Sequence, residues 1–395
     1  MLPVLAALSL TAGCGKKEAI KHQEWHRPTP AESEGNASFD AYVEAAHLTA
    51  AAAPTSISRS TFTAGDRSKL IHQLRGAVSK VELGTRSKCE FIPGVPRSDA
   101  ELDRLKAWRL VGRVLVWKIE EAVATGNWDT AITWVTVAMR FGIDLSQGGG
   151  QETTLGYTIA SEARKAIAPH LVNLSPAQLT RLADSTEASL KRADRKSALE
   201  REREQMLYSV QLVQDSYLKK NWETLETLMF KDGREAIDYL KGLEEEESGA
   251  YFTGMAAEAN EIADQVEANS EIGARERKPL DLDERPDRPW KRFSKHFFRF
   301  SETLLSLSDE FYARTKLLAL NSRLLAAVKS KGAAPAKLPG DEDLRTDPYS
   351  GEAFVYRSTG SDFIVYSIGE DLRDDGGDTD EGAFRPDLRL DDRSY

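Results

Sequence analysis

The stretch that decides the fold class runs from 102 to 139 and has the sequence LDRLKAWRLVGRVLVWKIEEAVATGNWDTAITWVTVAM. Its first part repeats apolar or small residues at alternating spacings of three and four, which places on one helix face Leu105, Trp108, Gly112, Leu115, Ile119 and Ala122. Gly126-Asn127 interrupts this pattern, and a second stripe follows with Trp128, Ile132, Val135 and Met139. The stretch therefore predicts two helices joined by a tight turn, an αα-hairpin.

The same helical periodicity extends outward, from about residue 36 to about residue 331. Ser175-Pro176 predicts a helix start, because serine caps a helix and proline fits its first position. Gly148-Gly149-Gly150 lacks the Lys-Ser/Thr of a phosphate-binding loop, so we expect a flexible loop between helices there.

A highly charged run extends from Lys191 to Glu204. Both signs are interspersed in it, which is typical of a solvated helix face. We expect Glu200, Glu202 and Glu204 to belong to that face, with a catalytic carboxylate among them as the alternative. The aromatic residues Phe293, Phe297 and Phe300 share one helix face and are expected in the core.

Two short β-rich runs lie near the C-terminus: 353–358 is AFVYRS and 363–368 is FIVYSI. Aromatic and β-branched residues of this kind suit a half-buried strand. The four residues between them, Thr359-Gly360-Ser361-Asp362, have the composition of a turn. The predicted fold is thus mainly α: a helical-hairpin body with a small α+β C-terminal module, made of a long helix and an antiparallel hairpin.

An acidic segment follows the second run. From Glu370 to Glu381 seven acidic residues accompany one basic residue, Arg373. Calcium prefers carboxylate and carbonyl oxygens, and Gly376-Gly377 lets the backbone bend so that its carbonyls point inward. A solvated acidic tail is the alternative, and the pattern leaves both open.

These C-terminal residues resemble the C-terminal part of the major pseudopilin of type II secretion systems. The matching features are Leu338-Pro339, Asp347-Pro348-Tyr349, an aromatic strand after Gly351, a strand ending Tyr366-Ser367-Ile368-Gly369, and the acidic Gly376-Gly377 loop. The resemblance covers roughly 338–382. The region also resembles a module at the ends of helical envelope proteins of planctomycete-type bacteria.

The resemblance implies a calcium-binding loop with the ligands Asp371, Asp374, Asp375, Asp378 and Asp380. Leu372 stands where the related loop usually has a turn-forming glycine. The long apolar N-terminal helix that polymerises pseudopilins has no counterpart in this sequence. We therefore do not expect a pilus subunit.

The N-terminus predicts the compartment. Leu2 to Leu10 is apolar but shorter than the roughly 20 residues that span a bilayer, so it fits the core of a signal peptide. The following Thr11-Ala12-Gly13-Cys14 resembles the lipobox of bacterial lipoproteins, in which the cysteine carries the lipid. An ordinary secretory signal with an incidental Cys14 is the alternative.

Composition and missing motifs bound the function further. The net charge of −10 disfavours nucleic acid and anionic lipid as main partners. Cys89 is the only other cysteine, and we expect a buried, inert thiol, although its basic neighbours would favour a lowered pKa. The sequence contains neither Gly-x-Ser-x-Gly nor His-Glu-x-x-His, and the six histidines are scattered, with His22 and His26 in the N-terminal tether.

The sequence is thus expected to divide into a signal peptide (1–14), a polar tether (15–35), a helical body (36–300) and a pseudopilin-like module (301–395). We expect a non-catalytic protein, anchored by its lipid to a bacterial membrane and facing the periplasm or exterior. Its expected role is to bind or scaffold an envelope protein, beside a secretion or pilus-like assembly, with calcium stabilising the C-terminal module. An envelope hydrolase with its site in the helical body is the alternative.

Overall fold

The structure is a computed structural model that describes residues 23–24, 36–92, 99–229, 233–377 and 387–390. It is mainly helical, with one small antiparallel sheet near the C-terminus, as the sequence predicts. None of the helices in these ranges has the length and apolar character to span a bilayer. The residues of the predicted signal peptide and most of the tether (1–22 and 25–35), including Cys14 and both histidines of the tether, lie outside the described residues.

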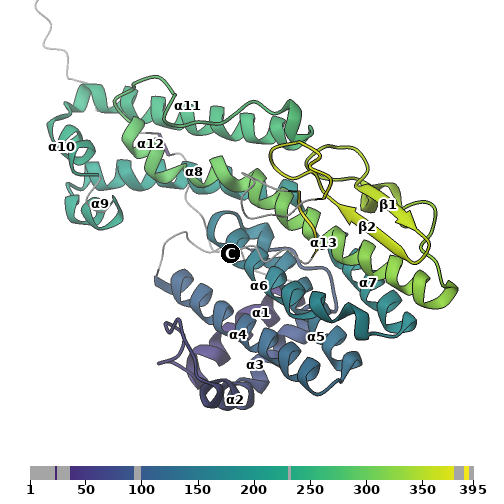
Figure 1. The fold of residues 1–395 in the computed structure, drawn as a ribbon. Helices are drawn as coiled ribbons and strands as arrows, with labels where there is room; N and C mark the ends of the chain where they lie inside the picture. Colours follow the sequence, from purple (N-terminus) through teal and green to yellow (C-terminus); the bar gives the residue numbers. More distant parts are fainter. Residues whose placement is uncertain (1–22, 25–35, 93–98, 230–232, 378–386, 391–395) are drawn as a thin grey trace, which may run out of the picture.

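The N-terminal half forms a helical bundle around what we call the first core (Figure 1). Its elements are α1 (Ala37–Ala52), α2 (Ala64–Gln73), α3 (Arg75–Gly84), α4 (Asp99–Ala124), α5 (Trp128–Leu145), η1 (Ser146–Gly148), α6 (Gly150–Ile167), η2 (Ala168–Asn173) and α7 (Pro176–Leu190). The predicted αα-hairpin is α4 and α5: Gly126 turns with φ +69°, and the Asn127 side chain accepts from the Thr130 N–H. The Ser175-Pro176 start is confirmed by a capping box with Gln178.

Helices α5 and α6 touch through their backbones. A Cβ added to Gly156 would lie 2.2 Å from the Gly142 carbonyl oxygen, and one added to Gly142 would lie 2.4 Å from the Gly156 carbonyl oxygen. Neither position has room for a side chain, so the crossing requires glycine on both helices. This close approach places the start of α6 against the first core.

A second group of helices surrounds the second core: α8 (Arg195–Leu218), α9 (Trp222–Met229), α10 (Arg234–Gly242), α11 (Glu245–Ser270) and α12 (Lys291–Phe297). Phe293 and Phe297 are buried in it, as their spacing predicts. The expectation for Phe300 is corrected, because it begins the next helix and is half-buried against the same core. The proline-rich segment 278–289 is packed against α13, because buried Leu282 donates its N–H to Glu302 (2.7 Å). Buried Glu258 accepts from Trp290 Nε1 (2.6 Å) and holds the end of that segment.

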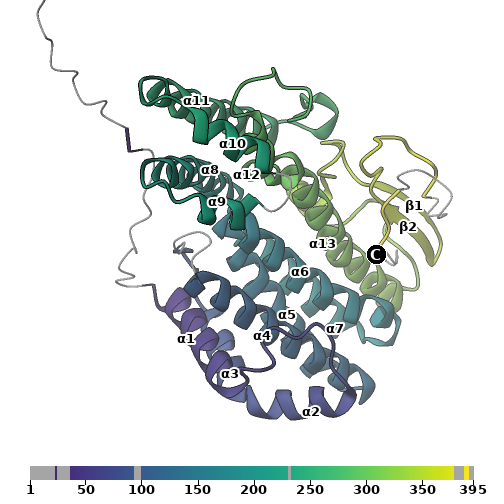
Figure 2. The ribbon, with the colours of Figure 1, turned by 90° about the vertical axis from the view of Figure 1, so that its left-hand side faces the viewer.

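Helix α13 (Phe300–Lys331) contributes to three cores. Leu304 packs in the second core, whereas Phe311 and Leu318 pack in the first. Leu317 and its neighbours pack under the C-terminal hairpin, in the third core. Figures 1 and 2 show α13 running from the second group of helices to the hairpin, alongside α6 and α7.

The C-terminal module contains α14 (Glu342–Arg345) and the hairpin of β1 (Val355–Thr359) and β2 (Asp362–Tyr366). The strands pair from Val355↔Tyr366 to Thr359↔Asp362, around a two-residue turn in which Gly360 has φ +63°. The predicted hairpin is therefore present. Asp347 joins its parts, because its carboxylate accepts from the Tyr349 N–H (3.1 Å), Ser367 Oγ (2.9 Å) and the Ile368 N–H (3.2 Å).

The structure corrects the expectation of a flexible loop at Gly148-Gly149-Gly150. All three residues are buried, and Gly149 and Gly150 have φ +78° and +35°. Their backbone is held by α8, since Gln205 Nε2 donates to the Gly148 carbonyl (3.2 Å). Glycine is needed here for close packing rather than for mobility.

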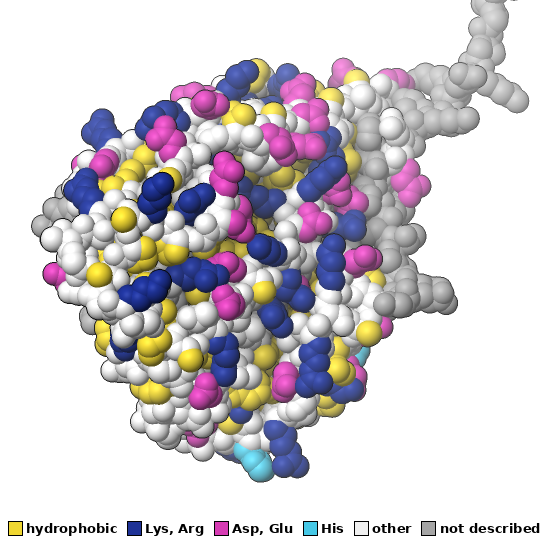
Figure 3. All heavy atoms as spheres, turned by 90° about the vertical axis from the view of Figure 1, so that its right-hand side faces the viewer, with side chains coloured by type: hydrophobic (Ala, Val, Ile, Leu, Met, Phe, Trp, Pro, Cys, Tyr) yellow, Lys and Arg dark blue, Asp and Glu magenta, His cyan; other side chains and the backbone are white. Residues whose placement is uncertain are grey.

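Charges of both signs are dispersed over the face that carries the C-terminal module (Figure 3). Lys and Arg side chains alternate with Asp and Glu, and apolar atoms show between them. A mixed surface of this kind produces no single-sign field on that face.

We predict that Gly156→Ala lowers the free energy of unfolding by about 1–3 kcal/mol, because the added methyl group must push α5 and α6 apart. Gly242→Ala is the matched control, since nothing lies within 4 Å of a Cβ at that position of α10. Alanine there should be neutral or stabilising by up to about 1 kcal/mol. Urea unfolding measures both variants, and equal stability of the two would contradict the backbone contact.

Candidate functional site

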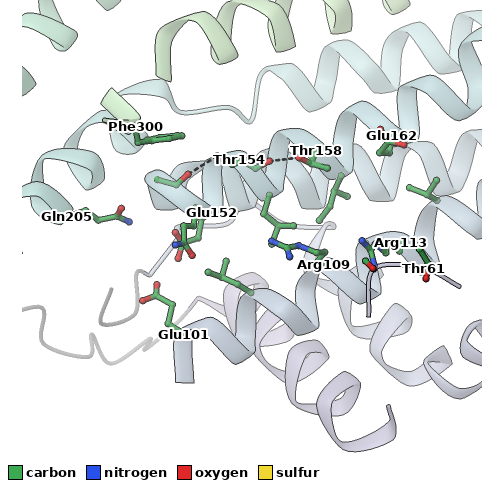
Figure 4. Close-up of a pocket in the computed structure, with 18 of the residues that line it drawn as sticks. Thr61, Glu101, Arg109, Arg113, Glu152, Thr154, Thr158, Glu162, Gln205 and Phe300 are labelled. Carbon is green, nitrogen blue, oxygen red and sulfur yellow. Dashed lines mark hydrogen bonds between the residues drawn. The ribbon is translucent and has the colours of Figure 1, made fainter. Parts of the chain in front are cut away.

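A cleft of about 1120 Å³ runs along the packed pair α4 and α6. These helices point in the same direction, because Glu101 contacts Glu152 near their N-termini and Gly112 lies against Ile159 further along. The 59–62 loop lines one end, and α8, α12 and the start of α13 line the other. Figure 4 shows the cleft with Glu101 and Glu152 at the end where Gln205 and Phe300 lie, and Arg109 and Arg113 toward Thr61.

A carboxyl pair occupies the deep end of the cleft. Glu101 is 5 % exposed and Glu152 is 2 % exposed, each in the first turn of its helix. Burial raises the pKa of Glu152 well above its usual range, and the hydrogen bond to Glu101 raises it further. The raised pKa favours the protonated form of Glu152, which donates to Glu101, an arrangement in which two neighbouring carboxyl groups hold one proton.

Buried polar atoms of α4, α6 and the turn η1 lie beside or within this pair. Arg104 Nη2 is 3.7 Å from Glu101 Oε1, and the Arg104 guanidinium lies over the Trp108 ring at 4.9 Å. Burial lowers the pKa of Arg104. Within the described residues, Arg104 Nε, Gln147 Nε2 and Glu152 Oε1 are buried without a hydrogen-bond partner. Atoms of this kind are unusual in a folded protein and mark positions where a water, an ion or a ligand completes the bonding.

Glu202 of α8 corrects the expectation of a fully solvated face. It is 5 % exposed, accepts from the Gly150 N–H (3.1 Å) and from Ser301 Oγ (3.1 Å), and lines the cleft. Its neighbours follow the expectation more closely, because exposed Glu200 pairs with Lys196 and Glu204 pairs with Arg201. Glu202 thus fixes the start of α6, and with it the position of Glu152.

Arginines outnumber acidic residues at the other end of the cleft, where Arg67 pairs with Glu120 (3.1 Å) and Lys165 pairs with Glu162 (3.1 Å). Arg113 donates to the Arg59 carbonyl (2.7 Å) and is held in place by it. Arg109, one turn earlier, is exposed and has neither a hydrogen bond nor an ion pair in the part of the chain that the structure describes. The charge of Arg109 lowers the pKa of Arg113, so the two side chains repel. An anion bound beside Arg109 would relieve that repulsion.

The cleft floor between these ends is apolar. Leu105 and Leu155 are buried there. Gly112 permits the contact with Ile159, since a Cβ at Gly112 would lie 2.6 Å from Ile159 Cγ1. Thr154 and Thr158 turn their hydroxyls to their own helix, at 3.2 Å and 2.7 Å from the carbonyls one turn back. The cleft thus has an acidic end, an apolar middle and a basic end.

Cys89 lies outside the cleft and is fully buried. Burial and the neighbouring Asp144 raise the pKa of its thiol, so the lysine and arginine nearby in sequence do not activate it. Asp144 itself accepts from Tyr42 (2.6 Å) and from Arg192 Nη2 (2.5 Å). The cysteine is a packing residue beside this buried network, as expected.

The predicted calcium ligands are only partly described. Asp371 accepts from the Arg373 N–H (3.0 Å), and Asp374 accepts from Tyr366 (2.6 Å) and the Gly376 N–H (2.9 Å). Asp375 is exposed, whereas Asp378 and Asp380 lie outside the described residues. Among the residues that are described, no group of three or more His, Cys, Asp or Glu side chains is placed to hold a metal. Calcium binding stays a prediction.

Two further residues shape the acidic loop. Leu372 has φ +61°, the left-handed conformation that glycine adopts easily in the related loop. Asp387, which sequence reasoning missed, is buried and accepts from the Gly377 N–H (2.7 Å). Burial, with Asp374 and Asp375 nearby, raises its pKa to about 6. Only the fold brings Asp387 back to the loop, so no local sequence signal announces it.

We predict that Glu152→Gln reduces the pH dependence of stability. The raised pKa of Glu152 means that the folded state binds a proton that the unfolded state releases, so the wild type loses stability as pH rises through and above the ordinary glutamate pKa. Glutamine keeps the donor to Glu101 without that linkage. Urea unfolding at pH 5 and pH 8 should show a smaller loss for Glu152→Gln than for wild type, with exposed Glu162→Gln behaving as wild type. Parallel pH profiles would disprove the protonated carboxyl.

Comparisons with protein-family models, with curated proteins and with solved structures found no match for this chain. The functional assignment therefore depends on the residues of the cleft. The distinguishing features of the cleft are the buried carboxyl pair, the apolar floor and Arg109 at the opposite end.

Proposed function

We propose that this chain is a non-catalytic binding protein of the bacterial cell envelope and that its ligand occupies the cleft between α4 and α6. The observation that carries this proposal is the cleft itself, about 1120 Å³ in volume and lined by charged groups at both ends. Ligand sites are typically clefts of about 300–1000 Å³ with an apolar lining and a few placed polar groups. This cleft is slightly larger than that range, and its lining combines an apolar floor with more charged and polar side chains than is typical.

The envelope location rests on the sequence alone. The short apolar run before Thr11-Ala12-Gly13-Cys14 supports export and lipid attachment at Cys14. The resemblance of 338–382 to the pseudopilin module supports a role beside a secretion or pilus-like assembly. A lipid at Cys14 would hold the cleft near a membrane, at the end of the 15–35 tether.

Labelling with a fatty acid should tag the wild type but not Cys14→Ser, because the cysteine sulfur carries the lipid. Equal labelling of both proteins would contradict lipid attachment at Cys14.

A hydrolase is the second candidate, favoured by the carboxyl pair. A carboxyl group with a raised pKa inside a cleft suits a general acid. The pair does not suit glycoside hydrolysis, because its groups are hydrogen-bonded directly, whereas glycosidase carboxyls are separated by roughly 5–9.5 Å. Directly paired carboxyls that share a proton occur in aspartic proteases. Binding remains the first proposal because the cleft supports it with charged groups at both ends, whereas the hydrolase is supported by the carboxyl pair alone.

Ligand retention tests the proposal. Wild type, Thr158→Trp and Thr180→Trp would each be incubated with the small-molecule fraction of a bacterial envelope, and native mass spectrometry would detect retained compounds. Thr158 lines the cleft, whereas Thr180 is an exposed threonine of α7 with the same hydroxyl bond to its own helix. We expect a compound retained by wild type and Thr180→Trp and lost from Thr158→Trp.

The same experiment separates binding from catalysis. An unchanged mass of the retained compound agrees with a binding protein, and a hydrolysed product favours the second candidate. Retention by all three proteins alike would place the ligand elsewhere and contradict the proposed site.

We also propose that calcium stabilises the C-terminal module through the acidic loop. Seven acidic residues from Glu370 to Glu381, with Asp387 behind them, repel one another unless a cation is shared. A ligand that binds only the folded state adds about 2.7 kcal/mol at a hundredfold excess over Kd. Calcium should therefore raise the melting temperature of wild type relative to chelator, and Asp378→Ala/Asp380→Ala should lose that increase. Asp103→Ala/Asp238→Ala, on exposed helix surface, should keep it; a wild type insensitive to calcium would refute the site.

A further inference from the structure

The carboxyl pair lies at the acidic end of the cleft. Glu152 is 2 % exposed and lines the cleft, and apart from the proton shared with Glu101 its Oε1 has no hydrogen-bond partner among the described residues. Figure 4 draws the Glu101 and Glu152 carboxyl groups side by side at this end. A buried carboxyl oxygen facing a cleft is costly unless something donates to it. The bound group must therefore bring a donor.

The charges around the pair decide which donor fits. Glu101 and Arg104 belong to α4, Glu202 to α8 and His296 to α12. Glu202 is already bonded to Gly150 and Ser301, and Arg104 is one cation against two carboxyl groups. Both carboxyls can ionise only if a second cation replaces the proton on Glu152. A primary ammonium group provides a positive charge and three donors in a small volume.

A bound anion would balance the charge of Arg109 at the opposite end of the cleft. Arg109 is two turns from Glu101 on α4, which corresponds to roughly 12 Å at ~1.5 Å per residue. It faces the cleft and has no acidic partner within the described ranges, and Arg113 beside it repels it. The ligand is thus expected to carry a negative group roughly 12 Å from its ammonium group.

The middle of the cleft restricts what joins these charges. Leu105, Leu155 and Ile159 form an apolar floor, while exposed Thr154 and Thr158 lie along the rim. An extended peptide of four residues spans roughly 13 Å between its termini, because each residue advances at most ~3.6 Å. Small apolar side chains would cover the floor, and peptide N–H groups would meet the threonine oxygens.

We propose that the cleft binds short peptides of about four residues with free termini, the α-ammonium group on the Glu101/Glu152 pair and the α-carboxylate on Arg109. This inference rests on the proposed binding function and specifies its ligand. Binding would exchange the proton of Glu152 for the ammonium group of the peptide. The protein would therefore release about one proton for each peptide bound.

Calorimetric titration with tetra-alanine, N-acetyl-tetra-alanine and tetra-alanine amide tests the proposal on the whole protein. Loss of a hydrogen bond to a charged group usually weakens binding about tenfold or more. We expect the acetylated and the amidated peptides each to bind at least that much more weakly than tetra-alanine. Titration in phosphate and in Tris measures the proton released, and binding should be tighter at pH 7 than at pH 6.

Two variants test which residues bind each terminus of the peptide. Glu152→Gln should abolish the proton release and the discrimination against the acetylated peptide, and Arg109→Gln should abolish the discrimination against the amide. Glu121→Gln, at an exposed residue of α4 outside the cleft lining, should bind as wild type. Equal affinity for all three peptides, or binding of none, overturns the peptide assignment. If wild type binds none but still retains an envelope compound that Thr158→Trp loses, the binding function stands and only this inference fails.

Discussion

The burial of α13 is the constraint on which the rest of the structure depends. This helix supplies apolar side chains to all three cores, so each of them is incomplete without it. Its charged residues must then find partners inside the protein. Asp309, which is 1 % exposed, forms ion pairs with Arg195 at the start of α8 (3.2 Å) and with Arg277 in the segment after α11. Leaving a buried carboxylate without such partners is strongly destabilising, so the ion pairs fix where α8 begins.

The cleft follows from that placement. With Arg195 held at Asp309, α8 passes the start of α6, where Glu202 reaches the Gly150 N–H and Gln205 reaches the Gly148 carbonyl. The first turn of α6 then lies beside the first turn of α4, because α5 returns the chain in one crossing. Two helix N-termini, each bearing a glutamate, meet in a space closed by aromatic residues of α12 and α13. Their partial positive charges favour carboxylates there.

The helices, the αα-hairpin and the β-hairpin could be predicted from the sequence because each has a local signal. The stripe from Leu105 to Ala122, the Ser175-Pro176 start and the turn at Gly360 need no knowledge of distant residues. The site has no such signal. Glu101, Glu152 and Glu202 look like ordinary helix-surface acids, and only helix packing decides which of them is buried. The three glycines at 148–150 were the available hint, since consecutive glycines before a helix also mark a close approach of two backbones.

The position of α13 in the chain has a consequence for biosynthesis. The first core begins to form from residues near position 40, yet it closes only when Phe311 and Leu318 arrive. The chain is made from the N-terminus, so most of it must be synthesised before that core can exclude water. Contacts between residues so far apart in sequence also slow folding, because a long loop must be closed before they form. The faces of α6 and α7 that α13 covers therefore stay exposed until it is made, and a nascent chain of this protein is a natural client for a chaperone.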